Sequence, residues 1–180
     1  MKLHLGCGKR FIEGFIHVDL QKLPHIDYHT SVDDLNFAAD NSVDLIYVSH
    51  VLEHFGRHEY KNVLKEWYRV LKPSGILRVS VPDFDAVVKY YTEKEANLHR
   101  LLGFLVGGQK IGEHDYHHMV FNQKILQEAL EETGFTNVRK YNWRETEHSH
   151  IDDFSQAYLP HMDKENGMLM SLNLEAEKSS

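Results

Sequence analysis

The strongest constraint on this chain is a short buried strand that runs directly into two glycines. Lys2 to Leu5 has the pattern of such a strand, and Gly6-Cys7-Gly8 follows it without a spacer. Glycines at this point let the backbone turn tightly and let a ligand approach without contacts from a Cβ atom. A turn that merely ends a strand has the same pattern, so the glycines alone leave both interpretations open.

The rest of the sequence predicts strands that alternate with helices. Further strands are expected at residues 15–20, 26–31, 43–49, 76–81, 136–143 and 168–176. Amphipathic helices are expected at residues 57–71, at 84–105, and from the N-cap Asn122 to Gly134. This alternation predicts an α/β fold: a Rossmann-like sandwich with a mostly parallel central sheet and helices on both faces.

Composition limits the classes of protein that remain. With 180 residues and no repeat or linker, we expect a single domain over residues 1–180. The net charge of -7 argues against nucleic-acid partners. No apolar run is long enough to span a bilayer, so we expect no membrane partner. Cys7 is the single cysteine, which excludes an intramolecular disulfide and favours a reducing, cytoplasmic location.

Two further features point to a nucleoside ligand. Asp19 ends the second predicted strand, and a carboxylate there can accept hydrogen bonds from both hydroxyls of a ribose. A surface or capping role is the alternative for an aspartate at this place. Phe11 stands where a dinucleotide fingerprint needs a third glycine, which disfavours an NAD-dependent oxidoreductase.

Polar residues also follow the predicted central strand, in Ser49-His50-Val51-Leu52-Glu53-His54. Taken in order, LHLGCG, VDL, DNSVDLIYVSHVLEHF and EWYRVLKPSGILRVSVPD resemble the class I methyltransferases that depend on S-adenosylmethionine (SAM). The similarity is greatest to a short bacterial branch of predicted methyltransferases (methyltransferase type 11-like), some of them associated with surface-glycan synthesis. It is strong over residues 2–83 and weaker beyond them.

The resemblance implies the function and the site. It implies methyl transfer from SAM to an unidentified acceptor, such as a small molecule or a glycan. Gly6 and Gly8 would pass under the methionine part of SAM, and Asp19 would hold its ribose. The other residues expected at the cofactor are Cys7 and Leu20 in the same two loops, Ser31 and the Val32 amide at the adenine, and Ser49 and His50 near the methyl group.

His50 and His54 are the candidates for a catalytic base, because histidine suits proton transfer near neutral pH. We favour cofactor contact for His50 and packing or capping for His54. Asp83 could orient a substrate, although an N-cap role is favoured slightly. Because the sequence reaches its first strand almost at once, we expect residues 107–118 or 144–163 to cover the site.

Two histidine clusters could bind metal, but we expect no metal. His114, His117 and His118 have helical spacing, yet glycines nearby favour a loop and no cysteine accompanies them. The cluster at His148 to Asp153 is a weaker signal of the same kind. Metal-dependent hydrolysis therefore ranks last, and a catalytically idle SAM-fold module that binds a partner is the main alternative to an active enzyme.

Overall fold

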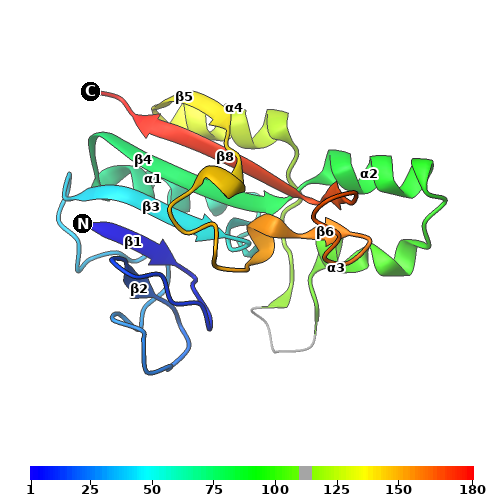
Figure 1. The fold of residues 1–180 in the computed structure, drawn as a ribbon. Coiled ribbons are helices and arrows are strands. Elements are labelled where there is room, and N and C mark those ends of the chain that lie inside the picture. The colour runs from blue at the N-terminus through cyan, green and yellow to red at the C-terminus, as the bar shows by residue number, and fades with distance from the viewer. Residues whose placement is uncertain (110–114) are drawn as a thin grey trace.

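The structure is a computed structural model that describes residues 1–109 and 115–180. Its centre is a six-stranded sheet with the strand order β2-β1-β3-β4-β8-β5 (Figure 1). The strands are β1 (Lys2–Leu5), β2 (Ile16–Val18), β3 (Val43–Ser49), β4 (Leu71–Pro82), β5 (Phe135–Lys140) and β8 (Ser171–Lys178). Only β8 runs against its neighbours, so the predicted α/β fold with a mostly parallel sheet is confirmed.

Alternation along most of each strand gives the sheet an apolar face and a second face, here called the polar face, which combines polar side chains with a small apolar cluster. On β1, Leu3 and Leu5 belong to the main hydrophobic core, whereas His4 points to the opposite face. On β3, Ile46 and Val48 take the core side and Tyr47 takes the other. The same alternation continues along β4 and β8, where the residues off the core side include Arg78, Ser80, Asn173 and Glu175.

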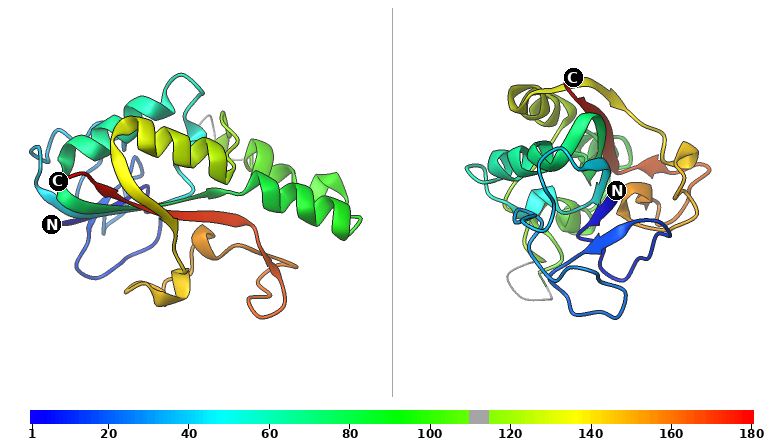
Figure 2. Two further views of the ribbon diagram at one scale, coloured as in Figure 1. Left: turned by 90° about the horizontal axis from the view of Figure 1, so that it is seen from above. Right: turned by 90° about the vertical axis from the view of Figure 1, so that its left-hand side faces the viewer.

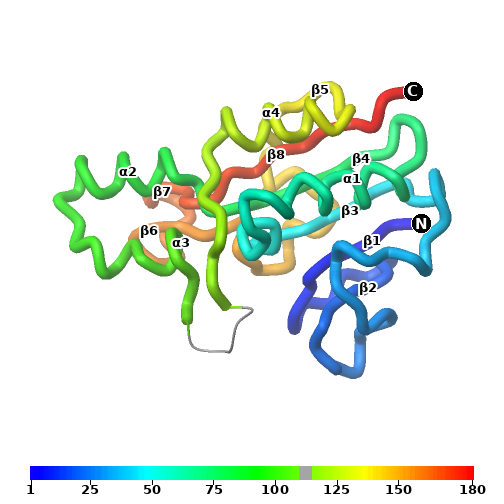
Figure 3. The backbone as a smooth tube through the Cα atoms, turned by 180° about the vertical axis from the view of Figure 1, so that it is seen from behind, coloured from blue at the N-terminus to red at the C-terminus, as the bar shows by residue number. Residues whose placement is uncertain are grey.

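Two helices cover the apolar face. α1 (Tyr60–Val70) and α4 (Gln123–Thr133) both lie on the side of the sheet seen in Figure 3. Trp67 of α1 is fully buried, and its indole N–H donates a 2.8 Å hydrogen bond to the Val32 carbonyl. The predicted caps of α4 are confirmed. The Asn122 side chain accepts from the Ile125 amide, and Gly134 ends the helix at a φ of 110°.

An irregular segment, residues 141–157, covers the polar face. It contains two short 3-10 helices, η4 (Trp143–Glu145) and η5 (Phe154–Gln156). The left view of Figure 2 shows this segment on one side of the sheet and α1 and α4 on the other. Side chains of the sheet hold it: the Tyr47 hydroxyl donates to Ser155 Oγ over 3.2 Å, and the Asn173 amide donates to the Ser155 carbonyl over 2.9 Å. The second face therefore carries 3-10 helices and loop rather than α-helices.

A smaller core lies beyond the carboxyl end of β4. It joins α2 (Phe84–Glu93), η2 (Leu98–Arg100) and α3 (Leu102–Val106) to the hairpin of β6 (Tyr158–Leu159) and β7 (Met168–Leu169) (Figure 1). The helix predicted at 84–105 is therefore three shorter helices, and the predicted strand at 168–176 is divided between β7 and β8. Asp83 is the N-cap of α2, where its side chain accepts from the Asp85 amide at 3.0 Å. No helix in the described ranges is both long and apolar enough to cross a membrane.

The strand predicted at residues 26–31 is wrong. The segment makes a single bridge, between Val18 and Tyr28. The amides of Asp27 and Tyr28 both donate to the carbonyl of His17, and the Asp27 carboxylate accepts from the His17 amide. The Asp27 carboxylate and the shared His17 carbonyl thus replace the evenly spaced hydrogen bonds of a parallel strand pair, and strand pairing ends at this bridge.

Candidate functional site: a cavity at the carboxyl ends of β1, β2 and β3

The two glycines after β1 have different structural roles. Gly6 and Gly8 adopt left-handed φ values of 61° and 53°, which favour glycine. A Cβ atom on Gly6 would lie 2.3 Å from Cγ2 of Val51, so packing alone requires glycine there. A Cβ atom on Gly8 would meet no atom within 4 Å. Gly8 therefore faces open space, as a ligand-binding position does.

Asp19 joins the loop after β1 to the loop after β2. Its Oδ2 accepts a 2.7 Å hydrogen bond from the Gly8 amide, and its Oδ1 accepts a 2.8 Å bond from the Gln21 amide. The side chain is 7% exposed. Each carboxylate oxygen has two lone pairs, so Asp19 can still accept from a ligand while it holds both loops.

A cavity of about 190 Å³ opens at this edge of the sheet. Its lining includes six of the residues predicted for the cofactor: Gly6, Cys7, Gly8, Asp19, Ser49 and His50. The remaining lining residues are His4, Arg10 and Gln21, which the sequence did not indicate, and Asp153 and Phe154, which lie in a segment expected to cover the site. Convergence of loops at the carboxyl ends of parallel strands is where α/β sheets bind ligands.

The other predicted site residues lie outside this cavity lining. The Leu20 side chain is 53% exposed. Ser31 donates a hydrogen bond to Asp33, and Val32 is buried in the main core. The ring of His54 lies beside His117, with 4.9 Å between ring centroids, so His50 and His54 do not share the cavity.

His50 occupies a strained position at the end of β3. Its φ is 56°, a left-handed value that is uncommon outside glycine and that clusters at functional sites. Its amide donates to the Ser80 carbonyl at 2.9 Å, and its Nε2 lies 2.8 Å from Ser171 Oγ. Burial, followed by the nearby rings of His117 and His54, lowers the pKa of His50 to about 3. The ring is therefore neutral at physiological pH.

Cys7 lines the cavity with an unreactive thiol. It is a free thiol with 2% of its surface exposed. Burial, reinforced by the charge of Asp19, raises its pKa to about 12. Because the thiolate is the nucleophilic form, this side chain is a packing group and not a nucleophile.

Phe154 forms the outer wall of the cavity, from the segment that covers the polar face. Its ring stacks on His50 with centroids 5.2 Å apart, and the Arg10 guanidinium lies 5.4 Å from its centre. Arg10 also donates from Nε to the Asp152 carbonyl at 3.2 Å. Residues 152–154 thus lie over the site, within one of the two segments expected to cover it.

The enclosed volume is smaller than the usual range for small-molecule pockets, roughly 300–1,000 Å³. It can hold part of a nucleoside cofactor, with the remainder lying across the open loops. A larger hollow of about 480 Å³ runs along α4. Its described lining consists of Asp85 and polar side chains of α4, without strand ends or glycine loops, so it lacks the features of a cofactor site.

The described histidines of the two predicted clusters lie in different surroundings. His114 lies outside the described residues. His117 packs against His54, whereas His118 is exposed. His148 is buried on the polar face, with its ring centroid 4.0 Å from that of Tyr47.

Comparisons with known proteins find similarity to methyltransferases. Residues 11–79 match the family described as "Methyltransferase domain". No curated protein matches the chain. A SAM-dependent methyltransferase from Archaeoglobus fulgidus has a similar structure, with a TM-score of 0.59 and 17% identity over 98% of this chain and 85% of its own.

Two further solved structures have the same fold. The 1,6-didemethyltoxoflavin-N1-methyltransferase of Burkholderia thailandensis, solved with S-adenosylhomocysteine, has a TM-score of 0.58 and 14% identity over 99% of this chain and 71% of its own. The CurJ carbon methyltransferase has a TM-score of 0.57 and 15% identity over 99% of this chain and 48% of its own. Part of the chain therefore matches a methyltransferase domain, and the whole chain shares the fold of these solved methyltransferase structures.

Proposed function

We propose that this protein transfers a methyl group from SAM to a small-molecule or glycan acceptor. One observation carries the proposal: the Gly6–Gly8 loop is tied to Asp19 at the edge of a cavity that the end of β3 completes. The methyltransferase-domain match includes Asp19 and His50, and this match and the shared fold support SAM as the cofactor.

The residues around the cavity fit the parts of SAM. Gly8 presents open space for the methionine part, and Asp19 keeps lone pairs for the ribose hydroxyls. Ser49 and His50 close the end of the cavity where a methyl group would be exposed to an acceptor. The buried Oγ of Ser49 has no hydrogen-bond partner in the described structure, so it is available to a ligand. We place the adenine outside the enclosed volume, towards Ser31 and Val32.

SAM supplies a methyl group that is already activated on a sulfonium, so the protein needs mainly to orient an acceptor and exclude water. His50 is suited to contact and orientation rather than to proton removal, because a ring with a pKa of about 3 is a weak base. His54 lies outside the cavity lining, which supports a role other than direct base catalysis.

The fold is compatible with several kinds of methyl acceptor. Among the similar structures, one is named as an N1-methyltransferase and another as a carbon methyltransferase, so the shared fold serves several acceptor atoms. The partly exposed Phe154 and the Arg10 beside it offer a stacking surface and a positive charge next to the cavity. Both suit a small polar acceptor. The lone, buried cysteine supports the proposed cytoplasmic location.

Transfer of a radiolabelled methyl group from SAM to a panel of small hydroxyl-, amine- and sugar-bearing acceptors tests this function. We expect turnover on at least one acceptor, and a loss of turnover in His50→Ala. The exposed His58 provides the matched control, and His58→Ala should retain full turnover. Tight binding of S-adenosylhomocysteine without transfer to any acceptor would favour the idle SAM-fold module instead.

A further inference from the structure

A buried carboxylate without a hydrogen-bond partner lies behind the wall of the cavity. Glu53, in η1 (Leu52–His54), is 1% exposed, and neither Oε1 nor Oε2 has a hydrogen-bond partner in the described structure. Its Oε1 lies 3.5 Å from Nδ1 of His50 and 3.9 Å from Nε2 of His117. Buried polar groups nearly always have a hydrogen-bond partner, and buried charges are paired with another charge or coordinate a metal. The side chain therefore indicates a missing ligand.

Two histidines close to Glu53, His54 and His117, are oriented as metal ligands are. Nδ1 of His54 lies 3.0 Å from the Tyr116 carbonyl, and Nδ1 of His117 lies 3.2 Å from the Phe104 carbonyl. A carbonyl oxygen can only accept, so each Nδ1 must carry the proton of its ring. In the neutral rings this leaves Nε2 with a free lone pair, and a backbone carbonyl on the other nitrogen is the usual support of a metal-bound histidine.

Backbone hydrogen bonds hold the three residues together across the chain. The amides of His118 and Met119 both donate to the Glu53 carbonyl, at 2.8 and 3.1 Å. The amide of His117 donates to the Val106 carbonyl at 3.3 Å. His117 is therefore fixed against η1 by its neighbours on both sides. The cluster is a built feature of the fold and not a chance approach of exposed side chains.

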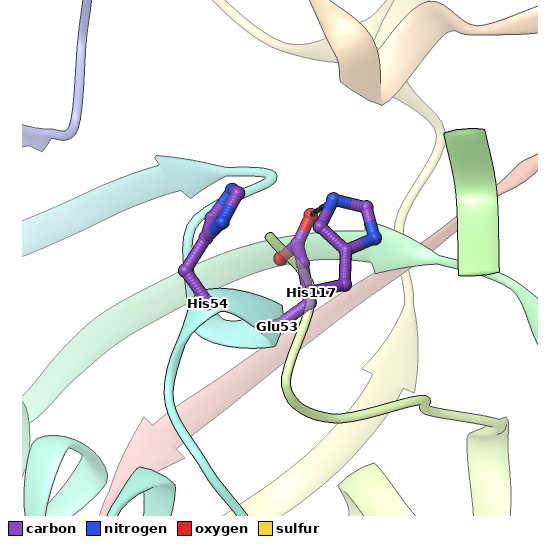
Figure 4. A group of neighbouring side chains, drawn as sticks. All are labelled: Glu53, His54 and His117. Atoms are coloured by element: carbon purple, nitrogen blue, oxygen red, sulfur yellow. Dashed lines mark ion pairs between the residues drawn. The ribbon is translucent and has the colours of Figure 1, made fainter. Parts of the chain in front are cut away.

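We propose that Glu53, His54 and His117 bind a divalent transition-metal ion (Figure 4). One ligand atom from each residue lies within 4.8 Å of the others. Metal–ligand bonds of about 2.0–2.2 Å would need these atoms to close to about 3.3 Å, which small side-chain rotations supply. Two imidazoles and a carboxylate suit zinc, manganese, iron or cobalt better than calcium.

The proposed metal site lies next to the cavity. His50 lines the cavity and also lies 3.5 Å from Glu53, so a single side chain separates the ion from the cofactor site. Three protein ligands leave at least one coordination position for water or for an oxygen of an acceptor. The contact with an acceptor rests on the proposed function, but binding of the ion does not.

The test is calorimetric titration of chelator-treated protein with zinc chloride. We expect one zinc ion per chain, and an affinity at least tenfold weaker in Glu53→Gln, His54→Ala and His117→Ala. The controls are His58→Ala and His118→Ala, which remove exposed histidines four residues from His54 and next to His117. These controls should bind zinc as the wild type does.

Circular dichroism of each variant checks the fold, and His117→Ala decides the outcome if Glu53→Gln fails to fold. Absence of zinc binding in the folded wild type would overturn the proposal, as would equal affinity in His117→Ala and His118→Ala. Titration of the same samples with S-adenosylhomocysteine keeps the two proposals apart. A wild type that binds zinc but not S-adenosylhomocysteine contradicts the proposed function, whereas one that binds S-adenosylhomocysteine but not zinc contradicts the metal site.

Discussion

The backbone amide of Gly8 donates a 2.7 Å hydrogen bond to Oδ2 of Asp19. This bond joins the loops that follow β1 and β2, and the Gln21 amide occupies the other oxygen of the same carboxylate. No helix connects β1 to β2. The Asp19 carboxylate therefore fixes the two loops relative to each other, which a connecting helix would otherwise do. Asp19 is thus a structural support of the glycine loop as well as the candidate ribose ligand.

Asp19→Ala should lose binding of S-adenosylhomocysteine and also lower the free energy of unfolding. It leaves two backbone amides without their acceptor, at a cost of about 1–3 kcal/mol. Asp19→Asn keeps one carbonyl oxygen and should lie between the wild type and Asp19→Ala in both properties. Calorimetric titration and urea unfolding measure the two effects. Wild-type affinity in Asp19→Ala would remove Asp19 from the cofactor site.

Phe154→Ala should change ligand binding while it changes stability little. The ring is 55% exposed but stacks on His50 and lies beside Arg10 at the cavity. Its loss should alter the affinity for S-adenosylhomocysteine at least threefold and lower the free energy of unfolding by less than about 1 kcal/mol. Tyr91→Ala is the matched control, since Tyr91 is 49% exposed and lies outside the cavity lining. Equal affinities in the two variants would contradict the assignment of Phe154.

Acid should destabilise the protein through its buried histidines. Burial, together with the neighbouring His17, His148 and Arg10, lowers the pKa of His4 to about 3 from a value of 6.5. The unfolded chain therefore binds a proton that the folded chain does not between these pH values. The stability contributed by neutral His4 is complete above pH 6.5 and is lost as the pH falls towards 3.

Urea unfolding at pH 7.5, 6.0 and 5.0 measures this dependence. Each such histidine contributes a slope of at most about 1.4 kcal/mol per pH unit. His4→Gln should reduce the slope, whereas His58→Gln, at an exposed position, should leave it unchanged. An unchanged slope in His4→Gln would show that other groups dominate the acid response.

The sheet and its apolar helices could be predicted from sequence because their signals are local. Periodicity located β1 and β3, the Asn122 cap located α4, and the glycines after β1 located the cavity. The segment that covers the polar face, residues 141–157, was harder to predict from the sequence. The alternation of His4 and Tyr47 with apolar neighbours does signal a sheet with a polar face. The residues that form hydrogen bonds with Tyr47 on this face, Asp153 and Ser155, lie more than 100 positions from it in the sequence, in an irregular segment.

The other residues of the candidate sites could not be predicted, because the residues that position them are far away in the sequence. Phe154 reaches the cavity because distant residues, Tyr47 and Asn173 among them, hold its segment on the sheet. His117 lies beside Glu53 because the amides of His118 and Met119 donate to the Glu53 carbonyl, across a separation of about 60 residues that no local pattern encodes. The strand predicted at 26–31 failed for the opposite reason: its alternating pattern was present, but the Asp27 side chain replaced the ladder.

The most direct test of the cofactor site is calorimetric titration of Gly8→Ala and Gly14→Ala with S-adenosylhomocysteine. Both glycines have left-handed φ values, 53° and 81°, and a Cβ atom at either meets no protein atom within 4 Å. Alanine should therefore strain both backbones similarly, by roughly 1–2 kcal/mol. Only Gly8 lines the cavity. We predict micromolar one-to-one binding to the wild type and Gly14→Ala, and its loss in Gly8→Ala. Equal binding by the two variants, or no binding by the folded wild type, would contradict the site.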